Sequence, residues 1–496
     1  MLDQIIGFLN DALYSYILII ILVLGGIFFT VRTKFVQFRL FKEQIRCVTE
    51  KPSKKGAVSS FQALMVSTAS RVGTGNIIGV TSAILTGGPG AVVWMWISAF
   101  FGMLTNYAEN VLGLYYRKKD KNGNFSGGAF YYIAYGLKQK WLGYIAAFFC
   151  LFAAVGMSGV QTNKISGTFT SVMNLNSDMA KIIIGIVVAV ITGVVVIGGI
   201  KRIGKVASLL VPFMSLVFII MSVIIIAINF AAIPETLRLI FTSVFSAKAV
   251  AGGVGGFAFA KIIQKGLARG VFSNEAGLGS SVIAHSASEV REPVKQGLWG
   301  IFEVFFDTFV ICTLTALVVL TTNVASGAYQ SGAFFGAFDG ATFKVANDSA
   351  TALSAFTQNL GITGGIVFSI FLPLFAFTTI LAWSYYGEKA TEFFFQWLPE
   401  KGQKTAVVCF KVIYVLLIVL AAVIEGELLW AIDDTFNGLM ALPNLIAVVL
   451  LSGQVVKITK NYYDRKKGKD VVPMLSAYPE LNEEFIKDLE NEAATK

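Results

Sequence analysis

Arg71-Val-Gly-Thr-Gly-Asn76 interrupts an apolar stretch at a point where a membrane-spanning helix should be unbroken. Apolar residues dominate positions 61–66 before it and positions 77–85 after it. In hydrocarbon, backbone N–H and C=O groups released from a helix cost several kcal/mol unless another group satisfies them. A break of this kind is therefore typical of a binding site, where free amides meet an anion and free carbonyls meet a cation. The alternative is a glycine kink that serves only helix packing.

A second glycine-rich interruption, Gly252-Gly-Val-Gly-Gly-Phe257, lies roughly half a chain later. Two broken segments in corresponding halves of a chain predict a secondary transporter. The second break would supply carbonyls and a close backbone approach from the opposite half of the site. Phe257 is a candidate lid over an apolar substrate face, although an aromatic residue in a membrane helix often only packs. Lys261, one turn further on, can snorkel towards the interface, and its role stays open.

The composition places the chain in a membrane. Hydrophobic residues make up 55% of it, charged residues only 14%, and the mean hydropathy is +0.70. Apolar runs of about 20 residues recur, each long enough to cross a bilayer. The net charge of +10 does not predict a nucleic-acid partner, because the basic residues form short clusters between apolar runs. The four cysteines are scattered singly and fit neither a disulfide framework nor a metal site.

We expect an all-α membrane protein with eleven transmembrane helices. The expected spans are 13–31, 58–86, 90–116, 141–170, 179–200, 206–230, 248–268, 295–321, 362–386, 404–424 and 428–452. The corresponding units are an extra N-terminal helix (1–31), a basic cytoplasmic connection (32–57), two five-helix repeats (58–230 and 231–452) and a cytoplasmic tail (453–496).

Basic clusters follow every second span. They occur at 32–55, 117–121, 201–205, 291–295 and 457–469, whereas alternate connections such as 85–90 and 323–361 carry almost no Lys or Arg. The positive-inside rule then places the N-terminus outside the cell and the C-terminus in the cytoplasm. The ten spans after the first divide into two sets of five that start from opposite sides. This division predicts inverted repeats, each of which begins with a broken helix.

Three segments resemble the alanine or glycine:cation symporter family of bacteria and archaea. They are Arg71-Val-Gly-Thr-Gly-Asn-Ile-Ile-Gly79, Gly87-Gly-Pro-Gly-Ala-Val-Val-Trp-Met-Trp96 and Ala268-Arg-Gly-Val-Phe-Ser-Asn-Glu-Ala-Gly-Leu-Gly-Ser280. The resemblance extends from Gly56 to Leu450 and is most specific in the Ser-Asn-Glu-Ala-Gly run at 273–277. It implies the fold of the amino acid–polyamine–organocation superfamily, a five-plus-five repeat preceded by one helix. It also implies import of small neutral amino acids through the cell membrane by alternating access, with Na+ or less often H+.

The first break offers groups that suit a zwitterionic amino acid. The amides of Thr74 and Gly75, at the start of the outer half-helix, are candidates for binding the carboxylate. The side-chain oxygen of Asn76 can accept from the ammonium or coordinate an ion. The resemblance places Gln161 beside the substrate, although a hydrogen bond between helices would equally explain a polar residue there.

Residues of the ninth span are expected to face the first break. Thr378 and Thr379 carry hard hydroxyl oxygens that suit Na+, and with the Ala69 and Val72 carbonyls they resemble the sodium site shared within the superfamily. A threonine in a membrane helix can instead bond its own i−4 carbonyl. Trp383 lies one turn beyond Thr379 on the same helix face and, with Phe257, would limit the substrate to a small side chain.

Ionisable residues within the spans are functional candidates. Arg71, Glu109, Glu303 and Asp307 qualify, and Glu303 and Asp307 are spaced to share a helix face. Arg71 stays charged and must meet a carboxylate or water, so a gating or structural ion pair is favoured over direct ion coupling. We expect Ser273-Asn-Glu275 to begin a helix at the inner gate, with capping by its side chains. The single histidine, His285, predicts no metal or catalytic site.

Other functions fit the sequence less well. An enzyme would need a nucleophile with its base, or metal ligands, and no such motif is present, so no cofactor is expected beyond Na+ as coupling ion. A channel would favour repeated pore-lining motifs, whereas this chain has two dissimilar halves with one break each. A carrier of the same fold that takes glutamine, or that couples to H+, stays open.

Overall fold

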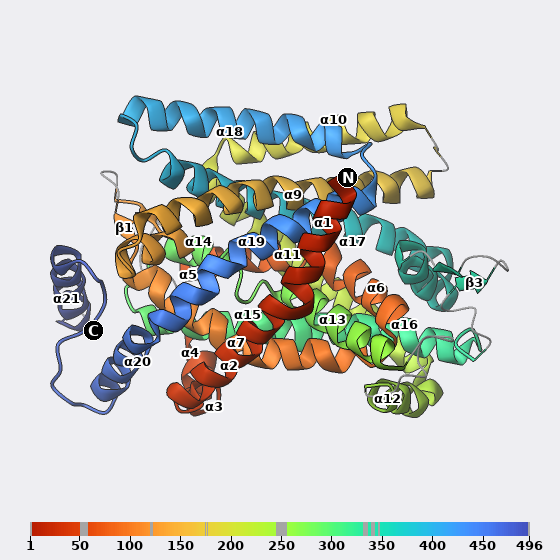
Figure 1. Ribbon diagram of the computed structural model, residues 1–496, viewed down its shortest axis with the longest axis horizontal. Coiled ribbons are helices and arrows are strands. Elements are labelled where there is room, and N and C mark those ends of the chain that lie inside the picture. Colours follow the sequence, from red (N-terminus) through yellow and green to blue (C-terminus); the bar gives the residue numbers. More distant parts are fainter. Residues whose placement is uncertain are drawn as a thin grey trace.

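The computed structural model describes residues 2–49, 58–119, 123–173, 175, 177–244, 255–330, 336–338, 343–345 and 348–494. Helices dominate these residues, as the all-α prediction requires, and two short hairpins are the only sheets within them (Figure 1). Seven helices in these ranges are long and apolar enough to cross a membrane, and an eighth is counted if two consecutive helices bent by 59° form one span. The chain is thus built as a multi-pass membrane protein.

The N-terminal segment crosses the outside of the helical body. α1 (Leu2–Ala12) continues through a π-helical turn (Leu13–Ile17) into α2 (Leu18–Arg32), which packs on α7 (Ala91–Tyr115). Two short helices, α3 (Val36–Arg39) and α4 (Phe41–Thr49), follow.

The first half of the body begins with a broken helix. α5 (Ser60–Arg71) starts at a capping box in which the Ser59 hydroxyl accepts from the Gln62 amide at 3.1 Å and the Gln62 side chain accepts in return. A 3-10 turn (Thr74–Asn76) separates α5 from α6 (Ile78–Gly87). The remaining elements are the hairpin β1 (Lys118–Lys119) and β2 (Phe125–Ser126), α8 (Ala129–Tyr131), α9 (Lys140–Val172), α10 (Asp178–Val196), α11 (Gly199–Ile228) and α12 (Ile233–Thr242).

The second half contains a second broken helix and the longest helix of the chain. Its elements are α13 (Gly255–Asn274), α14 (Ser281–Ser286), α15 (Pro293–Val304), a π-helical segment (Phe305–Cys312), α16 (Thr313–Ala325), the hairpin β3 (Gly336–Phe338) and β4 (Phe343–Val345), α17 (Asp348–Phe394), α18 (Glu400–Ala421), α19 (Gly426–Leu450), α20 (Ser452–Lys466) and α21 (Pro479–Ala494). α17 bends at Gly361, whose φ of 61° is non-helical, and the span expected to start at 362 begins directly after it.

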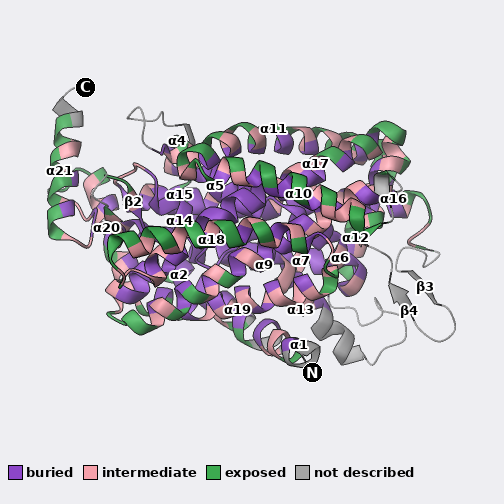
Figure 2. Cartoon of the chain, turned by 90° about the horizontal axis from the view of Figure 1, so that it is seen from above, coloured by how far each residue is buried: buried purple, intermediate pink, exposed green. Residues whose placement is uncertain are grey.

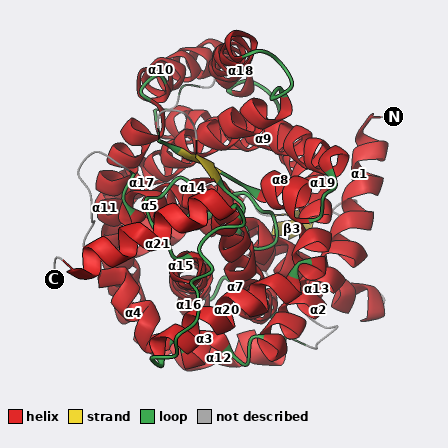
Figure 3. Ribbon diagram, turned by 90° about the vertical axis from the view of Figure 1, so that its left-hand side faces the viewer, coloured by secondary structure: helices red, strands yellow, loops and turns green. Residues whose placement is uncertain are grey.

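The helices pack in layers around a buried centre. α9 lies along α17 and α19, and α7 lies along α13 and α15, while α10 and α18 form an outer pair (Figures 1 and 3). Buried residues concentrate in the middle of the body and exposed ones on its outside (Figure 2). Large apolar side chains such as Val190, Leu209 and Leu416 are more than half exposed on α10, α11 and α18. Exposed apolar surface on this scale is what contact with lipid requires.

The part of the predicted second break that the structure describes, residues 255–257, is helical. Residues 252–254 lie outside the described ranges, but α13 runs without interruption from Gly255 past Phe257 to Asn274. The break lies at 275–280, where Glu275, Gly277 and Gly279 have φ values of 53°, 89° and 73°. A left-handed backbone is tolerated by glycine but costs other residues energy, so paired glycines specify the break here. The Ser273–Glu275 run therefore ends a helix instead of beginning one.

The C-terminal tail folds back against the body. The ring of Phe485 in α21 lies 5.8 Å from that of Phe125 in β2, and the amide of Ala477 donates to the Tyr115 carbonyl at 2.8 Å. Lys119 forms an ion pair with Glu484. The segment predicted as a cytoplasmic tail is thus an ordered cap on the end of α7.

Substitution of Gly26 should loosen the N-terminal helix. A Cβ at Gly26 would lie 2.4–2.7 Å from Phe101 atoms of α7, whereas a Cβ at Gly25 would meet only Val449, at 4.0 Å. We expect Gly26→Ala to lower the unfolding free energy by about 1–3 kcal/mol through overpacking, and Gly25→Ala to leave it unchanged or raise it. Thermal unfolding in detergent measures both, and equal melting temperatures would contradict the described packing of α2 on α7.

Candidate functional site

The first break releases a backbone carbonyl. In a continuous helix the Gly73 N–H would donate to the Ala69 carbonyl. Here it donates to the Arg71 carbonyl at 2.8 Å and to the Asn76 side-chain oxygen at 3.0 Å. Val72, with φ −76° and ψ 79°, is the centre of an inverse γ-turn. The Ala69 carbonyl thus loses its helical donor and is available to a neighbouring helix.

Oxygen atoms of α5 and α17 meet at this carbonyl. The Thr379 hydroxyl lies 2.8 Å from the Ala69 oxygen and 3.1 Å from the Phe375 oxygen. The Thr378 hydroxyl lies 3.0 Å from the same Phe375 oxygen, on the side of α11, where Met214 Sδ is 4.0 Å away. A Cβ at Gly73 would lie 2.6 Å from the Thr379 hydroxyl, so glycine is needed for this approach. The result is a buried cluster of carbonyl and hydroxyl oxygens, the ligand type that suits Na+.

The other side of the break faces α9 and α13. Gln161 accepts from the Thr74 hydroxyl at 3.0 Å and from its backbone amide at 3.4 Å. A Cβ at Gly75 would meet the Phe272 ring at 3.1 Å, and this ring lies 4.8 Å from the ring of Trp430. Thr74, Gly75 and Gln161, which the sequence analysis named, are therefore brought together and covered by an aromatic wall.

Trp383 lies one turn beyond Thr379 on α17 and is fully buried. Its ring contacts Tyr386 at 5.4 Å, and its indole N–H has no protein partner among the described residues. A buried indole N–H usually finds an acceptor. The structure thus places Trp383 near the cluster. The side chains of Phe257, predicted to limit the substrate together with Trp383, and of Lys261 lie outside the described residues.

Asn76 connects the break to α15 and the π-helical segment that follows it. Its oxygen is used by the Gly73 amide, and its NH2 group donates to Asp307 at 2.5 Å. Asp307 also accepts from Ser273 at 2.8 Å and from Thr308 at 3.0 Å. Both ends of the Asn76 side chain are thus bound to protein groups, which suits a residue that holds the shape of the break.

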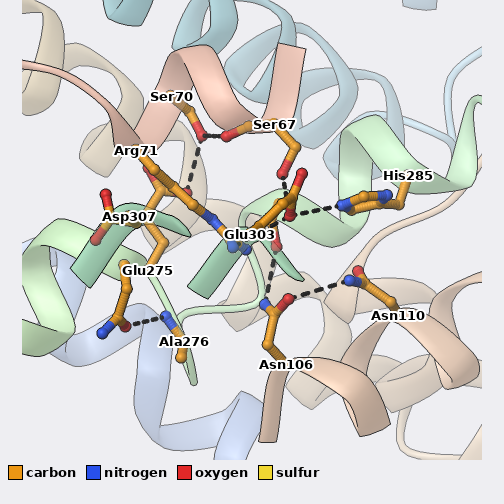
Figure 4. Close-up of polar contacts among 12 residues, drawn as sticks. Ser67, Ser70, Arg71, Asn106, Asn110, Glu275, Ala276, His285, Glu303 and Asp307 are labelled. Carbon is orange, nitrogen blue, oxygen red and sulfur yellow. Dashed lines mark hydrogen bonds and ion pairs between the residues drawn. The ribbon is translucent and has the colours of Figure 1, made fainter. Parts of the chain in front are cut away.

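Arg71, the last residue of α5, lies in a buried charge network (Figure 4). Its Nη1 is 3.1 Å from Glu303 Oε2, although no described acceptor is aligned for a hydrogen bond with the guanidinium. The same Glu303 oxygen accepts from Ser67 at 3.0 Å and lies 2.9 Å from His285 Nε2. The Gln296 amide lies 2.9 Å from the other ring nitrogen of His285. His285 therefore belongs to the network, which its isolation in the sequence did not indicate.

Carboxylates flank the second break. Glu275 accepts from Ser70 at 3.1 Å and from Ser280 at 2.5 Å, so it joins the two breaks. Glu109 accepts from the Gly277 amide at 3.4 Å and also binds Asn444, which donates to the Gly277 carbonyl at 2.8 Å. Glu109 thus satisfies backbone groups of the second break, whereas Glu303 pairs with Arg71.

Several residues of this region were missed in the sequence. They are Ser70, Phe272, Tyr386 and Trp430, and Glu275 was expected only as part of a helix start. The Gly277-Leu-Gly279 spacing after Asn274-Glu275 could have indicated the second break. Nothing distinguished Phe272, Tyr386 or Trp430 from the other aromatic residues, which form 13% of the chain.

With this geometry in view, the chain was compared with known proteins. Residues 1–475 match the model that describes the sodium:alanine symporter family. The chain belongs to this family. It is therefore a membrane transporter and not an enzyme. The predicted resemblance to alanine or glycine:cation symporters is confirmed.

Curated relatives are similar over nearly the whole chain. The sodium/alanine symporter AgcS of Methanococcus maripaludis is 38% identical over 474 residues, 94% of this chain and 98% of that protein. The probable sodium/glutamine symporter GlnT of Bacillus subtilis is 36% identical over 475 residues, covering 95% and 93%. The crystal structure of MhsT in complex with L-phenylalanine has the same fold, with a TM-score of 0.58 at 15% identity over 81% of this chain and 90% of that one.

Removal of the Glu303 charge should destabilise the protein strongly. Glu303→Gln leaves Arg71 buried without its carboxylate, and an unpaired buried charge costs about 3–5 kcal/mol. The control is Glu400→Gln, which removes the 2.9 Å pair with Lys404 on the surface and should cost less than about 1 kcal/mol. Unfolding of the purified variants in detergent measures both. If Glu303→Gln and Glu400→Gln had similar free energies of unfolding, the ion pair between Arg71 and Glu303 would make no net contribution to stability.

Proposed function

We propose that the chain imports small neutral amino acids, alanine or glycine, together with Na+ by alternating access. The observation that carries the proposal is the first break, which turns the Ala69 carbonyl towards the α17 hydroxyls and the Thr74 amide towards Gln161. One short segment thus offers oxygens to a cation and amides to a carboxylate. Two relatives, named as a sodium/alanine symporter and a probable sodium/glutamine symporter, agree with this chemistry.

In the proposed site, Na+ is held by the hydroxyls of Thr378 and Thr379 and by the carbonyls of Ala69, Val72 and Phe375. The two threonine hydroxyls lie 3.0 and 3.1 Å from the Phe375 oxygen, so each brings its own oxygen to the cluster. The bound ion replaces the hydrogen bond between Thr379 and Ala69. It thereby ties the unwound end of α5 to α17.

The amino acid lies on the opposite side of the same break. Its carboxylate is bound by the amides of Thr74 and Gly75, with Gln161 beside it, and Asn76 maintains the turn. Phe272 covers Gly75, and Trp383 closes the pocket from α17, with Phe257 as a further candidate. Walls of this kind reject a larger side chain by filling its space.

In this proposal the chain has eleven transmembrane helices. One extra N-terminal helix precedes two inverted repeats of five helices each, residues 58–230 and 231–452. The N-terminus lies outside the cell and the C-terminus in the cytoplasm. α5–α6 and α13–α14 are the broken helices of the two repeats. The Arg71–Glu303 ion pair, with Glu109 and Asp307 in the surrounding hydrogen-bond network, acts as the gate that closes around them.

The second candidate is a glutamine carrier, favoured by the identity with GlnT. Uptake of labelled alanine into proteoliposomes, in competition with each unlabelled amino acid and with Na+ or H+ gradients in turn, separates the two. We expect alanine and glycine to compete best and only Na+ to drive concentration. A stronger effect of glutamine, or uptake driven by H+ alone, would replace the proposal by the corresponding alternative.

Thr379→Val should weaken Na+ activation of alanine uptake. The substitution keeps the shape of the side chain but removes one oxygen ligand. A hydrogen-bonding oxygen on a charged group is worth about 1.5–3 kcal/mol. The Na+ concentration for half-maximal uptake should therefore rise roughly 10- to 100-fold. The matched control is Thr405→Val on α18, whose exposed hydroxyl bonds only its own helix at 2.9 Å. An unchanged Na+ dependence in Thr379→Val would remove this residue from the cation site.

Gln161→Ala should raise the apparent KM for alanine roughly tenfold at saturating Na+, because a partner of the break and of the substrate is lost. Asn163→Ala, two residues along α9, removes a side chain that instead donates to the Ile424 carbonyl at 2.7 Å, and should keep the wild-type KM. Initial uptake rates over a range of alanine concentrations test both. Equal KM values would mean that Gln161 only joins helices.

A further inference from the structure

Asp433 on α19 is a carboxylate that the proposed site does not use. It is fully buried, and neither of its oxygens has a hydrogen-bond partner among the described residues. Across the helix interface lies Gly156 of α9, where a Cβ would be only 3.0 Å from Asp433 Oδ1. The carboxylate therefore lies close to the backbone of α9, and a side chain larger than that of glycine at position 156 would crowd it.

Asn437 lies one turn further along the same face of α19. Its side chain is also fully buried, and neither its oxygen nor its nitrogen has a partner within the described part of the chain. Asp433 and Asn437 are close enough to interact with each other, but no other described group satisfies these four polar atoms on one buried stripe. Most buried polar side-chain atoms in native proteins have a partner, so a carboxylate and an amide left to each other in this way need an explanation.

The charges around Asp433 do not neutralise it. The groups that face it are Asp434, Glu275, Tyr14 and the guanidinium of Arg269. Arg269 is already bound, since its Nη2 lies 3.4 Å from Asp434 Oδ2 and its guanidinium stacks on the Trp430 ring at 4.7 Å. Asp434 also has Lys265 nearby and Glu275 has Arg71, whereas the only cation that reaches Asp433 among the described residues is this already paired Arg269. An ionised carboxylate in this position requires a further positive charge, because burying it unpaired costs more than a fold can supply.

We propose that Asp433, with Asn437, forms a second site for a monovalent cation, a proton or Na+, distinct from the oxygen cluster at Thr378 and Thr379. The carboxylate provides the charge, and the Asn437 amide oxygen provides a neutral ligand or an acceptor for the carboxyl proton. A neutral asparagine would fill the same space at a much lower desolvation cost than a carboxylate, so an aspartate here indicates that the charge is used.

The location connects this site to the first break from two sides. Trp430, one turn before Asp433 on α19, contacts the Phe272 ring that covers Gly75. On α9, Gln161 lies little more than one turn beyond Gly156 and binds Thr74. A cation that enters or leaves between α9 and α19 changes the packing of the two helices that hold the break. Its occupancy is thereby linked to the transport cycle.

The test compares wild type with Asp433→Asn in proteoliposomes. Wild type should show either a pH-dependent uptake rate at saturating Na+, for a proton, or one more Na+ per alanine than the variant, for Na+. Asp433→Asn should lose that dependence, yet retain alanine counterflow, which requires no net cation movement. The control is Asp348→Asn, a partly exposed carboxylate 3.8 Å from Lys164, which should keep the wild-type pH profile and stoichiometry.

An Asp433→Asn protein that is monodisperse and keeps both the wild-type pH profile and the wild-type Na+ to alanine ratio would overturn the proposal. If this variant does not fold, Asn437→Ala takes its place, and the same two outcomes decide. The transport assay rests on the proposed function, but direct binding does not. Equilibrium binding of radioactive Na+ and proton release on Na+ addition, measured on purified protein, therefore test Asp433 even if alanine is not the substrate.

Discussion

Backbone groups inside a membrane need partners within the protein, and this constraint governs both broken helices. In the first break, Asn76 satisfies the Gly73 amide, Gln161 satisfies the Thr74 amide and Thr379 reaches the Ala69 carbonyl. In the second, Glu109 and Asn444 serve the amide and carbonyl of Gly277. The side chains that repair the breaks come from α7, α9, α17 and α19. These helices therefore meet at the centre of the protein, where the backbone groups of the two breaks have their partners.

The cost of burying charge explains the second common feature of the centre. Arg71 ends α5 where the helix unwinds, and carboxylates from α7, the second break, α15 and the π-helical segment lie within its electrostatic reach. Hydroxyls of Ser67 and Ser70 and the imidazole of His285 complete the network. No member can move without leaving a partner unsatisfied, so the network couples the ends of both broken helices. Such coupling is the physical requirement for a gate that opens and closes as a unit.

Glycines and aromatic rings determine how closely other helices approach the first break. Gly73 admits Thr379, and Gly75 admits the Phe272 ring, so each glycine marks a close approach from a different helix. The Trp430 ring on α19 packs against the Phe272 ring, and the Arg269 guanidinium lies over the same Trp430 ring. Both rings come from helices of the second half of the chain, α13 and α19, and they cover a break that belongs to the first half.

The sequence by itself determined the membrane class, most helix positions, the first break and the need of Arg71 for a carboxylate, because hydropathy and glycine spacing report what each segment must bury. It did not indicate the break at 275–280, since the glycines at 252–256 interrupt an apolar run more visibly than Gly277 and Gly279 do. Ser273 and Asn274 also resemble a helix start, although the Asn274 oxygen accepts from the Ala276 amide at the end of α13. Only the tertiary structure decided that Glu303 pairs with Arg71, that Glu109 serves a backbone amide 168 residues away and that Asp433 lies against Gly156. A sequence states that a buried polar group needs a partner, but which group provides it depends on the packing of helices distant in the chain.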